Sequence, residues 1–139
     1  MDYRRFQPGD LAGVIALCVA EAWPSFPENP ARAQRALTAP GVVTVVAAAG
    51  DRIAGFAQLM SDGEIQAFLA LIAVAPDHRR KGVARQLLDL ALAEAGGLRI
   101  DLITDSADGF YTALRHRRLS GYRIFPPFDP DPETDAKGG

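Results

Sequence analysis

A long apolar run that passes through a proline and a basic turn into an amphipathic helix constrains the fold most. The run covers Ala67 to Ala75, and Pro76 ends it. Its apolar continuity predicts a strand over Glu64 to Ala75 that is buried on both faces. After the turn, apolar residues recur four apart from Val83, and Gly96-Gly97 terminates the predicted helix. A strand joined in this way to such a helix predicts an α/β domain in which the helix packs on a sheet.

The segments on both sides of this unit predict further strands and helices. Before the central unit they are a strand at Tyr3–Phe6, a helix that Asp10 caps and that ends near Trp23-Pro24, a helix at Ala31–Leu37, and a hairpin of strands at Val42–Ala49 and Ile53–Met60. After it they are a strand at Leu98–Thr104, a helix from Ala107 to about Arg118 and a short strand at Tyr122–Phe125. The result is a mixed α/β arrangement of alternating strands and helices.

Composition favours one globular domain and argues against two classes of partner. The 139 residues are 48% hydrophobic and 23% charged, so we expect a single domain over residues 1–125 and a loose tail, rich in Pro and Asp, over 126–139. With a net charge of −2, the chain does not produce the overall positive field that non-specific nucleic-acid binding demands. The longest apolar run has nine residues, far short of a membrane span, which takes ~20. The single cysteine, Cys18, fits a reducing compartment, and we expect the cytoplasm.

The turn between the strand and the helix predicts an anion site. Open backbone N–H groups and the helix dipole favour an anion at the start of a helix. Gly82 and Ala84 leave room for phosphate to approach the backbone, and Arg79, Arg80 and Lys81 add positive charge. The alternative is a solvated helix start, but basic residues there oppose the dipole unless an anion is bound. We therefore expect a pyrophosphate. Neither a P-loop nor a GxGxxG motif is present.

The run from Val74 to Leu88, V-x-P-x-x-R-R-K-G-V-A-R-x-L-L, resembles the acetyl-CoA signature of the GNAT superfamily of N-acetyltransferases, (Q/R)-x-x-G-x-(G/A), preceded by its strand. The order of predicted elements resembles that family over nearly the whole chain, the tail excepted. The resemblance implies a central mixed, mostly antiparallel sheet flanked by helices. It also implies that the strand before the signature and the strand at Leu98–Thr104 splay apart at the acetyl-CoA site.

The resemblance also implies roles for individual residues at the acetyl-CoA site. Backbone amides would hold the CoA pyrophosphate, with Arg79 closing the turn; they belong to Arg80, Lys81, Gly82, Val83 and Ala84. Ile72 and Val74 would offer backbone groups to the pantetheine arm. The amide of Val74 would donate to the thioester carbonyl and act as an oxyanion stabiliser.

A second family feature is a tyrosine on the helix after the splayed strand. Ala107 and Tyr111 keep the family's spacing from alanine to tyrosine, which makes Tyr111 the candidate general acid that protonates the departing CoA thiolate. Thr104 stands where the family has asparagine, and Gly121-Tyr122 follows six residues later than its G-F. The alternative is a core tyrosine with its hydroxyl at the surface.

The acceptor side carries aromatic and acidic residues but no recognisable motif. The family resemblance implies that the loop with Trp23 and Phe26 lies over the acceptor pocket, where these rings and Glu28 would bind a cationic amine. Glu21 flanks the same loop. The alternative is that both aromatic rings simply cap the core. The amine must lose a proton, and the signature strand has a carboxylate only at its beginning, Glu64, so a water wire or another element is expected to supply the base.

Other reactive residues are assigned no catalytic role. Cys18 lies on the apolar stripe of its helix without a nearby histidine, which argues against an acyl-enzyme. His78 and His116 lack ligand spacing, so no metal is expected. The basic run 115–118 could meet the CoA 3′-phosphate, although such a run is more often a solvated helix end.

Two hypotheses for function follow. The first is an enzyme, an N-acetyltransferase that moves the acetyl group from acetyl-CoA directly to a primary amine of a small molecule or peptide, without metal, nucleic acid or membrane. The alternative is a non-catalytic acyl-CoA-binding or regulatory module of the same fold. Tyr111→Phe separates them, because only an enzyme loses turnover by this change. Formation of a homodimer is left open.

Overall fold

The computed structural model describes residues 1–105 and 108–128. Contacts within the chain divide it into two units, Met1–Leu102 and Ile103–Gly139, each taken by itself below. The first unit holds the sheet and the helices that cover it. Among the described residues of the second unit there is one short helix, α5 (Asp108–Thr112). The division into a domain over 1–125 and a tail stays a prediction.

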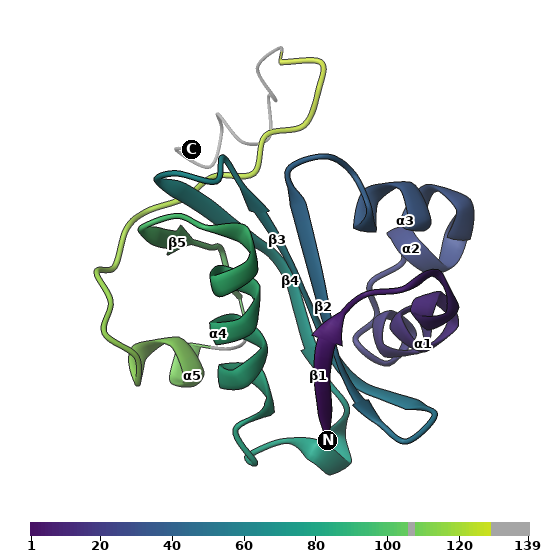
Figure 1. Cartoon of the computed structure of the whole chain (residues 1–139). Coiled ribbons are helices and arrows are strands. Elements are labelled where there is room, and N and C mark those ends of the chain that lie inside the picture. The colour runs from purple at the N-terminus through teal and green to yellow at the C-terminus, as the bar shows by residue number, and fades with distance from the viewer. Residues whose placement is uncertain (106–107, 129–139) are drawn as a thin grey trace. The chain divides into compact units, whose positions relative to one another are not determined.

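The first unit is built on a five-stranded sheet in the order β1-β2-β3-β4-β5 (Figure 1). The strands are β1 (Asp2–Arg5), β2 (Val42–Ala49), β3 (Arg52–Ser61), β4 (Gln66–Val74) and β5 (Arg99–Asp101). Neighbouring strands are antiparallel except β4 and β5, which are parallel. The expected mixed, mostly antiparallel sheet is thereby confirmed. Strand β4 begins later than predicted because Asp62 folds the preceding turn, accepting the backbone N–H groups of Glu64, Ile65 and Gln66.

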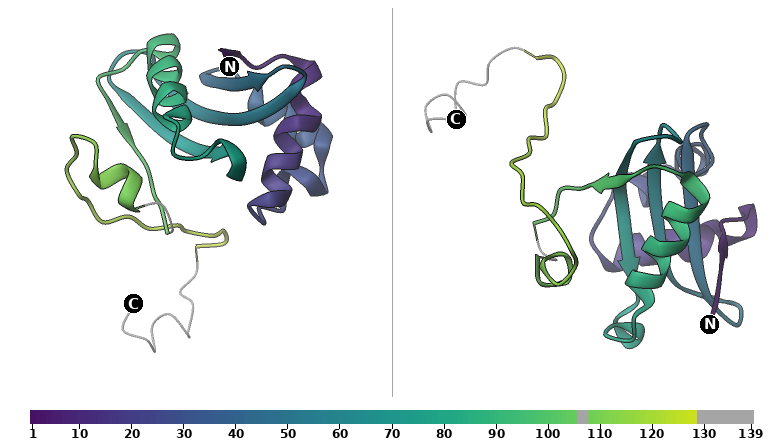
Figure 2. Two further views of the ribbon diagram at one scale, coloured as in Figure 1. Left: turned by 90° about the horizontal axis from the view of Figure 1, so that it is seen from below. Right: turned by 60° about the vertical axis from the view of Figure 1, so that its left-hand side comes forward.

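Helices cover both faces of this sheet (Figures 1 and 2). One face carries α1 (Leu11–Ala20), the single turn α2 (Ser25–Glu28) and α3 (Pro30–Leu37), and the other carries α4 (Val83–Ala95). Two short 3₁₀ turns precede α1 and α4, η1 (Pro8–Asp10) and η2 (Pro76–His78). The turn α2 lies in a segment predicted as loop; Pro27 fits there because the first N–H groups of a helix have no partner within it.

Asp10 stands before α1 as predicted but does not cap it. Its side chain forms no capping hydrogen bond to α1. Instead the carboxylate accepts two bonds from the Arg4 guanidinium and one from the N–H of Gln7. The aspartate therefore ties β1 to the turn that leads into α1.

The core has one apolar layer on each side of the sheet. On the side of α1 to α3, buried residues from the helices meet those of the strands; the cluster consists of Val14, Leu17, Cys18, Leu37, Val46, Ala48, Ile53, Phe56, Ala73 and Ala75. On the other side α4 approaches β3 closely at Gly55. A Cβ there would lie 3.2 Å from the Leu87 side chain and 3.3 Å from that of Val83, so the absent side chain lets the helix sit close to the strand.

A β-bulge at Ala70 changes which side chains of β4 face which helix layer. Leu69 lies opposite Leu59, whereas Leu71 lies opposite Gln58, so Ala70 has no counterpart on β3. Leu69 and Leu71, two apart in sequence, therefore face opposite sides of the sheet. Helices do cover both faces of β4, but the predicted full burial is wrong in part. The side chains of Phe68, Ala70, Leu71 and Ile72 are half-buried, since one edge of the strand is open at this point.

The end of the chain departs most from the predicted elements. The strand predicted over Leu98–Thr104 is only Arg99–Asp101, and the helix predicted to reach Arg118 ends at Thr112. The basic run 115–118 is exposed and lies beyond this helix, not at its end. The run supplies no apolar stripe and its three arginines repel each other, which disfavours continuation of the helix.

The closing strand predicted at Tyr122–Phe125 is also absent, since residues 113–128 form neither helix nor strand. A strand needs hydrogen bonds from a neighbour, and its own alternation cannot supply one. Ala107, and the predicted tail from residue 129 on, lie outside the described residues.

Candidate active site

An open strand edge is the central feature of the site. Strand β5 accompanies only Gln66 to Phe68, so beyond Phe68 no described strand of the first unit pairs with that edge of β4. The N–H of Ala75 donates to the carbonyl of Ala54 at 2.7 Å, so Ala75 points its backbone groups toward β3. Because backbone groups alternate along a strand, those of Val74 and Ile72 point to the open edge. The edge of β4 is thus open at the place where the sequence resemblance implied splayed strands, and β5 itself ends at Asp101.

The open edge leads to the start of α4. Gly82 precedes the helix with φ +79°, and Arg80 also adopts a left-handed conformation, with φ +60°. The first bond of the helix joins the N–H of Gln86 to the carbonyl of Gly82 at 3.1 Å, so the N–H groups of residues 83–85 precede the helical ladder. Apart from Gly82 itself and its two chain neighbours, no heavy atom of the described residues lies within 4 Å of the position that a Cβ on Gly82 would take. The turn thus presents backbone donors to open space, which suits an anion.

The charged residues of the turn divide into two groups. Arg80 and Lys81 are exposed and form no ion pair with the described residues. The Arg79 side chain instead folds back: its Nε donates to the carbonyl of Val74 at 3.0 Å, and a terminal nitrogen lies 2.8 Å from Oε1 of Glu21. The structure therefore brings the predicted turn residues 80–84 together at the helix start and turns the guanidinium of Arg79 away from them.

The predicted acceptor residues follow the end of α1. Ala22 adopts a left-handed conformation, φ +60°, and the N–H of Trp23 bonds to the carbonyl of Cys18 at 2.9 Å, which turns the chain sharply. Trp23 and Phe26 are half-buried against the core cluster on the α1 side of the sheet, and Glu28 is exposed. Both rings thus contact the core and keep part of their surface open.

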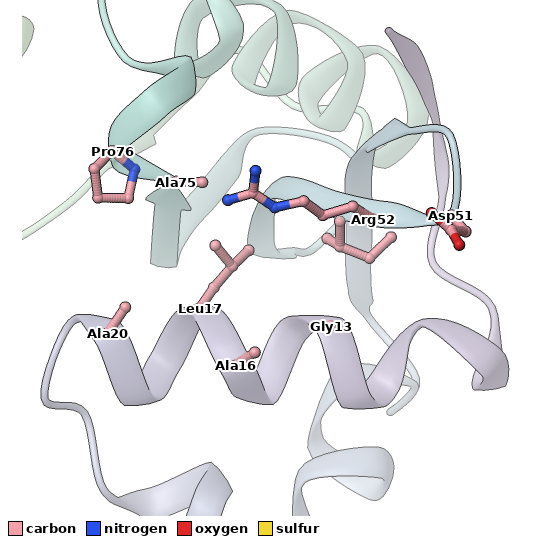
Figure 3. A pocket seen from close by; sticks show the side chains of 9 residues that line it. Gly13, Ala16, Leu17, Ala20, Asp51, Arg52, Ala75 and Pro76 are labelled. Carbon is pink, nitrogen blue, oxygen red and sulfur yellow. The ribbon is translucent and has the colours of Figure 1, made fainter.

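A separate pocket of about 240 Å³ lies between α1 and the ends of β3 and β4 (Figure 3). Ala16, Leu17 and Ala20 point from α1 toward Arg52 and Ala75; the remaining lining residues are Gly13, Asp51, Ile53 and Pro76. Arg52 is held by two hydrogen bonds to Asp77, at 2.7 and 3.0 Å. None of the residues predicted for the site lines this pocket. Most of its lining side chains are small and apolar, and they form no motif that could be recognised in the sequence.

Tyr111 belongs to the second unit. It lies on α5 and is half-buried, with its ring in edge contact with that of Phe110 at a centroid distance of 5.0 Å. Burial raises the pKa of the Tyr111 hydroxyl, because the phenolate is poorly solvated there. The hydroxyl is therefore protonated at neutral pH, as a general acid must be.

Comparison with known families identifies the class of protein. The sequence model of the acetyltransferase (GNAT) domain matches residues 40–114, more than half of the chain. The protein therefore belongs to the GNAT acetyltransferase family. The match includes β2 to α4 and Tyr111, and so contains the open edge and the turn. A search of curated proteins found no match.

Solved structures of acetyltransferases share the fold. An aminoglycoside 6′-N-acetyltransferase from Acinetobacter haemolyticus has a TM-score of 0.74 at 17% identity, covering 94% of this chain and 100% of that one. A ribosomal-protein-alanine N-acetyltransferase from Brucella melitensis biovar Abortus 2308 has a TM-score of 0.70 at 19% identity, with 90% and 99% covered. The aminoglycoside enzyme AAC(6')-Iy, in complex with a bisubstrate analogue containing CoA, has a TM-score of 0.68 at 22% identity, with 89% and 97% covered.

Residues 1–105 and 108–128 contain no group of three or more His, Cys, Asp or Glu side chains arranged to hold a metal ion. In the same ranges no helix is long and apolar enough to cross a membrane.

Proposed function

We propose that the protein is an acetyl-CoA-dependent N-acetyltransferase that moves an acetyl group directly to a primary amine of a small molecule or peptide. The observation that carries this proposal is the open edge of β4, which leads to the start of α4. There the backbone N–H groups have no partner within the helix. Membership of the GNAT acetyltransferase family supports the same reaction. Cys18 is a free thiol, which agrees with the proposed location in the reducing cytoplasm.

The residues of the turn and the edge fit the two ends of acetyl-CoA. The N–H groups from Arg80 to Ala84 would hold the pyrophosphate, because Gly82 leaves the approach open and the helix dipole favours negative charge. The backbone groups of Ile72 would bond to the pantetheine arm. Bound acetyl-CoA supplies an activated thioester, and the N–H of Val74 would stabilise the negative charge that develops on its carbonyl oxygen. Losing such a donor typically lowers the rate by about a hundredfold or more.

Two proton movements are required of the protein. Tyr111, whose hydroxyl stays protonated at neutral pH, would give a proton to the departing thiolate. The incoming ammonium must lose one, yet β4 carries no carboxylate and Glu64 lies in the turn before it. A chain of ordered water or a residue of another element would therefore carry this proton away.

The acceptor would bind beside the end of α1. Trp23 and Phe26 are half-buried, and Glu28, which is exposed, follows Phe26 by two residues on the turn α2. An aromatic surface next to an anionic group favours a cation such as an alkylammonium.

Calorimetric titration with CoA tests the proposal directly. The informative variant is Gly82→Ala, and Gly50→Ala is its matched control, because both glycines have positive φ, +79° and +64°, and open space around the missing Cβ. We expect equal losses of stability but a loss of CoA affinity of tenfold or more only in Gly82→Ala. Folded wild-type protein that binds no CoA would contradict the proposal. If CoA binds, turnover is then measured with acetyl-CoA and amines, as the release of the free CoA thiol.

A further inference from the structure

The Arg79 side chain joins two parts of the site that are far apart in the sequence. Its guanidinium contacts the carbonyl of Val74, at the end of β4, and the carboxylate of Glu21, which caps the end of α1. These contacts use Nε and one terminal nitrogen, leaving the guanidinium seated between strand and helix. The pair spans 58 positions in sequence, so the bridge exists only in the folded chain.

Each contact fixes a group that the proposed reaction uses. On the strand side, the bond to the Val74 carbonyl holds the end of the open edge, where the N–H of Val74 also points. On the helix side, Glu21 is followed at once by Ala22, which is held in the left-handed conformation, and then by Trp23. A left-handed alanine is strained, so the turn needs support from its surroundings. The bridge supplies that support one residue away.

The bridge also gives the two carboxylates of the acceptor loop different electrostatic environments. The carboxylate of Glu21 is neutralised by Arg79, whereas Glu28 forms no ion pair with the described residues. In the proposed enzyme, Glu28 would thus be left to face a cationic acceptor.

We infer that Arg79 and Glu21 are positioning residues that tie the acceptor loop, residues 21–28, to the acetyl-CoA edge of β4. This inference rests on the proposed function for its kinetic consequences but not for the tether itself. An exposed ion pair contributes little to overall stability. Breaking it should therefore loosen the loop without unfolding the protein. In kinetics, kcat/KM for the amine should fall, whereas the dissociation constant of CoA should change little.

The tether can be tested without turnover, because Trp23 is the single tryptophan. We expect Glu21→Gln to increase acrylamide quenching of Trp23 fluorescence and to leave the melting temperature nearly unchanged. Glu94→Gln is the matched control, since Glu94 pairs with Arg5 at 3.6 Å and also loses only a charge. Unchanged quenching in Glu21→Gln would overturn the inference whether or not the protein is an enzyme.

A charge exchange separates a tether from direct contact between Arg79 and the pyrophosphate. Glu21→Arg and Arg79→Glu should each lower kcat/KM for the amine by about tenfold, in keeping with the sensitivity of such reactions to small misplacements. The double variant should recover part of both the loss and the quenching change, with the CoA dissociation constant within about threefold of wild type. If Arg79 binds the pyrophosphate instead, Arg79→Glu weakens CoA binding and the double variant does not restore it. Failure of the wild type to bind CoA would count against the proposed function, and the quenching result would still decide the tether.

Discussion

The Asp10 carboxylate accepts hydrogen bonds from both terminal nitrogens of Arg4, at 2.7 and 3.0 Å. It also accepts one from the N–H of Gln7, at 2.8 Å. Its side chain is only 9% exposed, so water replaces few of these bonds. The bonds from Arg4 hold the pKa of Asp10 below its usual range. This small network fastens the edge strand β1 to the turn before α1.

Asp10→Asn is therefore expected to destabilise the protein by about 1–3 kcal/mol at neutral pH. Since the folded-state pKa is the lower one, the ionised carboxylate stabilises the fold fully above the ordinary carboxyl pKa of about 4 and loses this effect as the pH falls through the folded value. Urea unfolding across pH should show the gap between wild type and variant closing in acid. Asp2→Asn, at an exposed carboxylate 3.6 Å from Arg4, is the control and should change little. A gap that persists in acid would contradict this account.

Gly96 can be replaced only at the expense of the turn it forms. A Cβ on residue 96 would lie 2.6 Å from the backbone oxygen of Gly63, and its φ is +74°. We expect Gly96→Ala to lower the free energy of unfolding by more than about 1 kcal/mol, since the backbone must shift and adopt a strained conformation. Gly9→Ala should be close to neutral, because no described heavy atom beyond the neighbouring residues lies within 4 Å of the new Cβ. Equal effects of the two changes in thermal unfolding would refute the prediction.

Cys18 should be nearly unreactive in the folded protein. Burial, with a further contribution from the charge of Glu21, raises the pKa of its thiol to about 11. The thiolate is the reacting form, so labelling by a disulfide reagent at mildly alkaline pH should be slow and should accelerate when urea unfolds the chain. Fast labelling of the native protein would show that α1 is not packed as described.

Tyr111→Phe separates an enzyme from a binding module. If Tyr111 is the general acid, kcat should fall by about a hundredfold or more while the affinity for CoA stays the same. Because burial raises the pKa of this hydroxyl, wild-type turnover should decline only at a pH above the ordinary tyrosine value of about 10. Tyr122→Phe, at a ring that is 84% exposed, is the control. Unchanged kcat in Tyr111→Phe would remove Tyr111 from the mechanism.

The bulge at Ala70 is the clearest case of a site feature that the sequence pattern hides. Alternation alone places Leu69, Leu71 and Ala73 on one face of β4. The pairing with β3 places Leu69 on the α4 side and Leu71 and Ala73 on the other. In a run composed only of apolar residues, no polar side chain marks the point where the alternation changes. The extra residue is detectable only when both strands are present.

Much of the site was nevertheless predictable from local residue types. An apolar run forms the inner strand, a glycine permits the left-handed turn at residue 82, and spacing of four makes the helix that begins at Val83, because each of these depends on neighbours in the chain. Tertiary structure decided the rest. It paired Arg79 with Glu21 and left the edge of β4 open beyond Phe68. Hydrogen bonds between strands and ion pairs across 58 residues depend on how distant segments meet, which no local pattern records.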